Sequence, residues 1–158
     1  MASPTTSGQP GGPQRDDLLL AILPPDIDGV PVTVEEASFA EAVKDPAFAA
    51  NVASAAFAIV VSGEDLTSGV VAKLEPGVYG DGFFRDWRDS YDEGACAQAG
   101  GVAGNAQAEL DGRTVYIASC GGGLRVYHAY VKERGIIVSL FSVGERRFGE
   151  QLMSDLRP

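Results

Sequence analysis

The sequence predicts an α+β domain: a mainly antiparallel sheet with helices packed on one face. Three observations support this fold class. Residues 114–143 hold three runs of β-branched and aromatic residues separated by two glycine-bearing turns, the pattern of an antiparallel meander. Residues 81–97 carry aromatic side chains at helical spacing. At 158 residues, of which 45% are hydrophobic and 22% charged, the chain fits one globular domain.

The first 15 residues predict a disordered tether. Residues 1–14 are nearly all Ser, Thr, Gly, Pro and Gln, a composition that cannot bury a core. They lack the charged and apolar regions of a signal peptide. Two interpretations stay open: a flexible tether that remains after an export signal is removed, or the disordered tail of a cytosolic protein. Residues 16–158 then form the single α+β domain.

The segment before the first hairpin predicts an edge strand and a kinked helix. Residues 30–34 are expected to form a short strand that contains Pro31. Proline has no backbone N–H to donate to a neighbouring strand, so this strand is expected at a sheet edge. A helix over residues 38–55 breaks at Asp45, which can cap a second piece that begins with Pro46.

The middle of the chain predicts a hairpin and then a long helix. Residues 57–61 and 69–74 are the paired strands, and the first is apolar enough to be covered on both faces. In the helix over residues 81–97, an aromatic stripe points inward. Arg88 and Asp92 lie four residues apart and are expected to pair on the solvent side.

The last third predicts a loop, the three-stranded meander and a closing helix. Residues 98–108 are small and are expected to form a loop, whereas residues 145–156 have helical spacing. The predicted order is therefore β-α-β-β-α-β-β-β-α. Its first six elements match the order of a ferredoxin-like plait, and a curved cystatin-like sheet is the alternative.

The two cysteines are the strongest candidates for a defined chemical role. Cys96 ends the predicted aromatic helix and Cys120 ends a predicted strand. In an exported domain, two cysteines most simply form a disulfide. Two alternatives stay open: the cysteines are two buried free thiols, or Cys120 is a nucleophile with His128 as its base. One histidine and two distant cysteines fall short of a zinc site, so we expect no metal and no cofactor.

A ligand-contacting surface is expected from aromatic residues and the single histidine. Trp87, Tyr127 and His128 combine rings with polar tips, and a helix lying on a sheet can leave a cleft between such side chains. His128 is more simply a hydrogen-bonded residue on a sheet face. The glycines at positions 121–123 join two strands, so they predict a turn rather than a phosphate loop.

The charge balance limits the classes of partner. The chain has 22 acidic and 12 basic residues, a net charge of −10, which argues against nucleic acid and anionic membrane surfaces. No apolar run reaches the roughly 18 to 20 residues of a membrane helix. No motif in the sequence specifies a reaction.

Three stretches carry a resemblance to a known type of domain. L-P-P-D-I-D-G-V-P-V (23–32), F-F-R-D-W-R-D-S-Y-D-E-G-A-C (83–96) and G-R-T-V-Y-I-A-S-C-G-G-G (112–123) resemble exported or lipoprotein-type domains of high-GC bacteria, which carry no established function. The resemblance spans about residues 17–157. It implies export, adds weight to the pairing of Cys96 with Cys120, and implies no activity or catalytic residues.

Together these patterns predict an extracytoplasmic, non-enzymatic domain that binds a small ligand or an envelope protein. Two alternatives stay open. One is a small thiol-dependent enzyme that uses Cys120 and His128. The other is a structural, dimerising domain that uses the edge strand near Val30.

Overall fold

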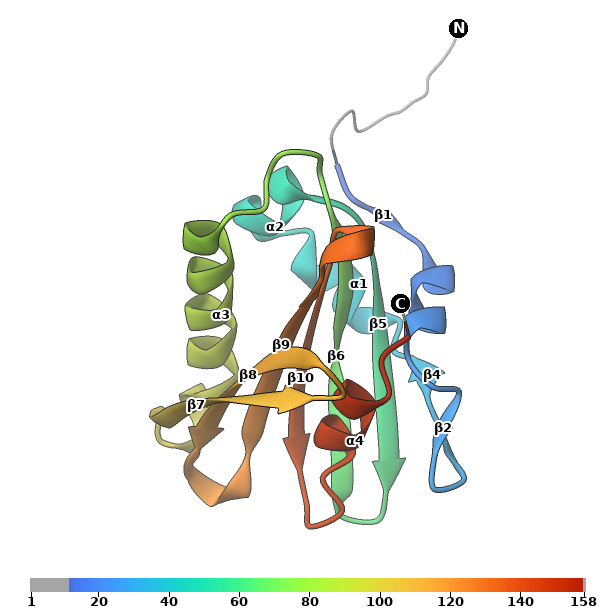
Figure 1. Cartoon of the computed structure of the whole chain (residues 1–158), viewed down its shortest axis with the longest axis vertical. Coiled ribbons are helices and arrows are strands. Elements are labelled where there is room, and N and C mark those ends of the chain that lie inside the picture. Colours follow the sequence, from blue (N-terminus) through green and yellow to red (C-terminus); the bar gives the residue numbers. More distant parts are fainter. Residues whose placement is uncertain (1–11, 158) are drawn as a thin grey trace, which may run out of the picture.

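The computed structural model describes residues 12–157 and is built around one mainly antiparallel sheet (Figure 1). The strand order is β1-β5-β6-β10-β9-β8-β7, and β4 also pairs with β5. The strands are β1 (Gln14–Arg15), β4 (Thr33–Val34), β5 (Val52–Ser62), β6 (Asp65–Leu74), β7 (Val102–Leu110), β8 (Arg113–Cys120), β9 (Arg125–Val131) and β10 (Ile136–Val143). The predicted α+β class with a mainly antiparallel sheet is confirmed.

The two halves of the chain meet at the centre of the sheet. The β5–β6 hairpin comes from the first half, and the meander that ends in β10 comes from the second. They join where β10 pairs with β6, from Ile136 opposite Lys73 to Val143 opposite Leu66. Both central strands are covered on their two faces, which explains why residues 69–72 of β6 and most of β10 are apolar.

Helices cover both faces of the sheet, which corrects the prediction that they share one face. Side chains alternate along β10, so Ile137 lies on one face and Val138 on the other. One face holds α1 (Ala37–Ala42), α2 (Pro46–Asn51) and α3 (Asp81–Cys96), and the other holds the 3-10 helix η2 (Asp17–Ile22) and α4 (Phe148–Ser154). The correction follows from the central strands, because neither of their faces could stay exposed to water.

The predicted loop over residues 98–108 is wrong in its larger part, because β7 pairs with β8 from Val102 opposite Cys120 to Leu110 opposite Arg113. The small side chains of β7 give no alternating pattern, so only backbone pairing reveals the strand. The turn Asp111–Gly112 has positive φ at both residues, 53° and 78°, as a two-residue hairpin requires. The meander therefore has four strands.

Boundaries near the N-terminal half also differ from the prediction. Asp45 caps α2 by accepting a hydrogen bond from the Ala47 amide at 2.9 Å, as expected. The helix ends at Asn51 rather than near residue 55, because Val52 is fully buried and begins β5. The predicted strand over residues 30–34 is split between β4 and the hairpin of β2 (Asp26–Ile27) with β3 (Val30–Pro31).

Residues 1–11 of the predicted tether lie outside the described residues, whereas Gln14–Arg15 form β1 and pair with β5. Within residues 12–157, none of the helices has the length and apolar character to cross a bilayer.

Candidate functional site

The three predicted ligand-contacting residues do not share one site. Trp87 lies on α3, and its indole contacts the same face of the sheet as His128. Tyr127 is the neighbour of His128 on β9 and therefore points to the opposite face, among the residues that pack against α4. A cleft formed by all three is excluded, because the sheet separates Tyr127 from the other two.

Trp87 and His128 belong to a buried polar network between α3 and the sheet. His128 Nε2 lies 2.7 Å from Asp92 Oδ1, and His128 Nδ1 lies 2.7 Å from Ser139 Oγ. Trp87 Nε1 donates to the same Ser139 Oγ at 2.9 Å, and the Tyr91 hydroxyl donates to the Ser139 carbonyl. Three elements, α3, β9 and β10, thus meet through these polar side chains.

The protons of this network can be assigned from its chemistry. Burial lowers the pKa of His128 below its ordinary 6.5, and the hydrogen bond to Asp92 only partly opposes this effect. The neutral imidazole then donates from Nε2 to the Asp92 carboxylate and accepts at Nδ1 from the Ser139 hydroxyl. Ser139 Oγ in turn accepts from Trp87. Every buried side-chain polar atom of the described residues has a partner.

The Asp92–His128–Ser139 chain resembles the acid, base and nucleophile of a serine hydrolase, but its surroundings do not allow that chemistry. Ser139 is 0% exposed and His128 is 1% exposed. The Ser139 oxygen already makes two side-chain hydrogen bonds, and none of the three residues lines either surface hollow described below. The network therefore fastens α3 to the sheet.

Asp92 corrects a further expectation from the sequence. It is 6% exposed and bonded to His128, rather than paired with Arg88 on the solvent side. The Arg88 guanidinium instead lies over the Tyr116 ring, 3.9 Å from its centroid. Because Asp92 precedes Cys96 by four residues, both share the helix face that meets the sheet, and this spacing could have revealed its burial.

Cys96 and Cys120 lie at disulfide-bonding distance, as the sequence predicted, with Cα atoms 5.3 Å apart. The bond joins the C-terminal end of α3 to the end of β8. Cys120 is thereby removed as a nucleophile, and there is no free cysteine among residues 12–157. His128 has no cysteine partner, since both of its ring nitrogens are bonded to Asp92 and Ser139.

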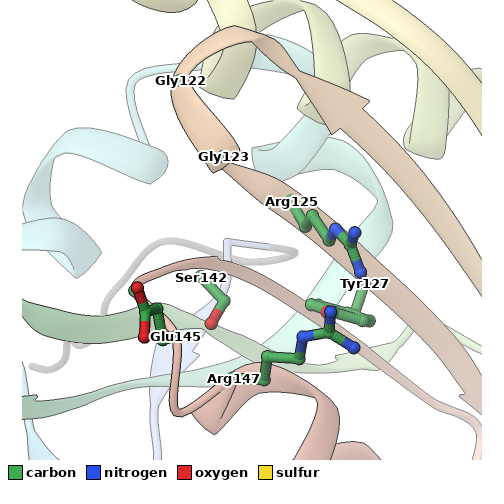
Figure 2. Close-up of a pocket in the computed structure, with 8 residues that line it drawn as sticks. Gly122, Gly123, Arg125, Tyr127, Ser142, Glu145 and Arg147 are labelled. Carbon is green, nitrogen blue, oxygen red and sulfur yellow. The ribbon is translucent and has the colours of Figure 1, made fainter.

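A hollow of about 320 Å³ opens on the α4 side of the sheet (Figure 2). Its polar side chains belong to Arg125, Tyr127, Ser142, Glu145 and Arg147, and its remaining lining residues are Gly122, Gly123 and Gly144. Figure 2 shows Arg125 and Arg147 on one side, with Tyr127 between them. Of the predicted ligand-contacting residues, only Tyr127 lines this hollow.

In this hollow, named the two-arginine hollow after Arg125 and Arg147, the positive charge of the arginines is largely uncompensated. Arg125 makes no ion pair with any other described residue. Arg147 has one distant partner, Glu150 at 3.8 Å, and its side chain is 56% exposed. Burial raises the pKa of Tyr127, although Arg125 beside the phenol opposes this, so the phenol stays protonated at neutral pH and can donate. Tyr127 is only 1% exposed, so the guanidinium groups of Arg125 and Arg147 are the main donors that the hollow presents to a ligand.

Two features of the backbone hold this hollow in place. Arg147 has φ +53°, in the left-handed region, immediately before α4. A Cβ on Gly149 would lie 2.8 Å from Ser142 Cβ and 3.0 Å from the Tyr127 ring, so only glycine lets α4 pack this closely. The Gly149 amide also donates to Ser142 Oγ at 3.1 Å. Sequence reasoning missed Arg125 and Arg147. Strand alternation from Tyr127 could have placed Arg125 on this face, whereas Arg147 is distant in the chain and belongs to no motif.

A second hollow, of about 340 Å³, lies where β8 separates from β9. One part of its wall is aromatic, where Tyr79 stacks on Tyr130 with ring centroids 3.6 Å apart and Phe84 meets Tyr116 edge to face. The rest of its wall is polar and consists of Asp111, Gly112, Arg113, Thr114, Lys132 and Glu133. These rings pack on one another, so they form part of the core that supports α3.

No protein-family model, curated protein or solved structure matches this chain. The resemblance to exported domains therefore stays a prediction.

Proposed function

We propose that this chain is an extracytoplasmic, non-enzymatic domain that binds a small carboxylate ligand in the two-arginine hollow. The observation that carries the proposal is Arg125, a cation without an ion-pair partner among residues 12–157, placed beside a second arginine and a phenol. Planar guanidinium groups bind carboxylates through paired, charge-assisted hydrogen bonds. In a protein with a net charge of −10, such a site is a local exception.

The size and charge of the hollow favour a small ligand with one negative charge. A volume of about 320 Å³ is at the lower end of the range for small-molecule sites, which begins near 300 Å³. Glu145 also lines the hollow and Glu150 lies near Arg147, so a doubly charged phosphate would meet more repulsion than a carboxylate.

The extracytoplasmic part of the proposal rests on the disulfide. Disulfides persist in oxidising compartments and are rare in the cytosol of most organisms. The Cys96–Cys120 pair, together with the resemblance of residues 23–32, 83–96 and 112–123 to exported domains, supports this location.

Two-dimensional NMR of isotope-labelled protein tests the binding site with sodium propionate as the probe and sodium chloride at equal ionic strength as the reference. Propionate should shift the backbone amide signals of Gly122, Gly123 and Gly144. Arg125→Gln should weaken this binding about threefold or more, because one charge-assisted contact is lost.

The matched control is Arg134→Gln. Arg134 is an exposed arginine in the turn at the opposite end of β9, and its loss should leave the propionate affinity unchanged. If propionate shifts no glycine of the hollow, or if Arg125→Gln binds it as well as the parent protein, the proposal is wrong.

A further inference from the structure

The two-arginine hollow carries charges of both signs. Glu145 lines the same hollow as Arg125 and Arg147, yet none of the ion pairs among the described residues includes Glu145. Figure 2 shows its carboxylate beyond Ser142, on the side away from the two guanidinium groups. An unpaired anion and an unpaired cation therefore border one small space without neutralising each other.

Opposite charges that border one hollow without pairing are complementary to a ligand with both charges. A carboxylate can bind to Arg125 and Arg147 while an ammonium group approaches Glu145. A ligand with a carboxylate alone leaves Glu145 unpaired and adds a second negative charge to the same space, which is unfavourable.

From this arrangement we propose that the hollow selects zwitterionic ligands of the amino acid or short peptide class. The proposal rests on the carboxylate site described above. Glu145 is its specificity-determining residue, because it distinguishes an amino acid from the plain carboxylate of the same length. The protein's overall charge adds to this preference, since a zwitterion is not repelled by a net charge of −10 whereas an anion is.

The surroundings of Glu145 support this role. It follows Gly144, which has φ +104°, a backbone conformation that favours glycine. A Cβ on Gly144 would meet the Asp65 side chain and would lie 2.8 Å from Asp65 Cα. The Asp65 carboxylate in turn accepts a hydrogen bond from the Arg146 amide at 3.0 Å. Glu145 is therefore held on both sides by fixed backbone, although its own side chain is exposed.

The test compares matched ligand pairs by NMR titration. Each ω-amino acid, from glycine through β-alanine and γ-aminobutyrate to ε-aminocaproate, is compared with the plain carboxylate of equal chain length. At least one amino acid should bind about threefold or more tightly than its carboxylate, as expected for one added ion pair at a partly exposed site. The chain length at which the amino acid binds most tightly relative to its carboxylate reports the separation between the two arginines and Glu145.

Two variants test whether Glu145 causes the tighter binding of the amino acid. Glu145→Gln should abolish the preference for the amino acid while it leaves or improves the affinity for the plain carboxylate. Glu133→Gln is the matched control, because Glu133 is an exposed glutamate in the turn at the far end of β9. It should preserve the preference.

The outcomes separate this proposal from the one on which it rests. If every amino acid binds like its carboxylate, or if Glu145→Gln keeps the preference, zwitterion selection is overturned. The carboxylate site survives that result if Arg125→Gln still weakens binding. If no ligand of either series binds, both proposals fall.

Discussion

At the residue scale, His128 is the link between α3 and the sheet. Its ring nitrogens bond Asp92 on the helix and Ser139 on β10, and all three side chains are buried. Such a network stabilises a fold only while every member has its partner, because an unpaired buried carboxylate is costly. The energetic role of His128 is therefore to satisfy Asp92.

Removal of His128 alone should be severe. His128→Leu leaves the Asp92 carboxylate buried without its partner, and we expect a loss of about 3 kcal/mol or more of unfolding free energy. The double variant Asp92→Leu/His128→Leu should lose much less than the sum of the two single variants, since it leaves no buried charge. Urea denaturation of the parent, the two single variants and the double variant measures the coupling between the two residues. Additive losses would show that the two residues are not coupled.

The same residue makes stability depend on pH. Well above pH 6.5, His128 is neutral in both the folded and the unfolded chain, and its contribution to stability is complete. As the pH falls below 6.5, the unfolded chain binds a proton first, because burial lowers the pKa in the folded state. Stability should therefore decrease with acidification until the pH passes the folded pKa.

His128→Gln provides the measurement of this effect. Glutamine does not titrate, so the decrease in unfolding free energy between pH 7.5 and pH 5.5 should be smaller in this variant than in the parent. Acidic residues contribute to both proteins and cancel in the comparison. Equal decreases in the two proteins would contradict the assignment of a lowered His128 pKa.

At the element scale, close contact between β6 and β10 depends on one glycine. A Cβ on Gly69 would meet the backbone carbonyl oxygen of Ser139 and would lie 2.7 Å from Leu140 Cα. These are backbone atoms of the central strand and cannot move aside without disturbing the sheet.

Gly69→Ala should therefore cost about 2 kcal/mol of unfolding free energy, in the range of overpacked cores. Gly104→Ala is the control, because Gly104 is also a strand residue but a Cβ there meets nothing within 4 Å. It should be neutral or slightly stabilising. Chemical denaturation of both variants measures the two changes in unfolding free energy, and equal changes would refute the close contact.

At the scale of the whole molecule, the disulfide closes a loop that contains β7 and most of β8. Cys96 and Cys120 are 24 positions apart, and closing a loop of that length contributes about 3.5 kcal/mol on the chain-entropy model. β7 is an edge strand with largely exposed side chains, so burial contributes little to holding this loop. The disulfide therefore supplies part of the stability that side-chain burial does not give to this loop.

Cys96→Ala/Cys120→Ala should lower the unfolding free energy by about that amount. Intact mass after thiol alkylation in denaturant gives the companion result for the parent protein. Its two cysteines should take up no label before reduction and two labels afterwards. Two labels without reduction would remove the main support for an extracytoplasmic location.

Parts of the fold could be read from local patterns, and parts could not. The aromatic stripe of α3 and the cap at Asp45 are local signals, and each is present as predicted. β7 escaped prediction because its small side chains have no periodicity and its pairing with β8 is a backbone property. The kinked helix was extended too far because burial of Val52 depends on the partner strand.

The candidate site was predicted less well than the fold, and alternation along β9 explains why. Tyr127 and His128 are neighbours in sequence, and the period of two places them on opposite faces. The sequence could have indicated this separation, but not which elements would cover each face. Arg125 shares a face with Tyr127 through the same alternation, whereas Asp92, Ser139 and Arg147 become neighbours of those two residues only through long-range packing.

The sequence by itself determined the α+β class, the antiparallel meander and the apolar face of α3, and it favoured the pairing of its only two cysteines. Tertiary structure decided which faces the helices cover, which residue becomes the partner of Asp92 and how two arginines and a glutamate come to border one hollow. The physical reason is the distance along the chain over which each kind of interaction acts. Turns, caps and side-chain periods act within a few residues, whereas a site made from several elements exists only after those elements pack.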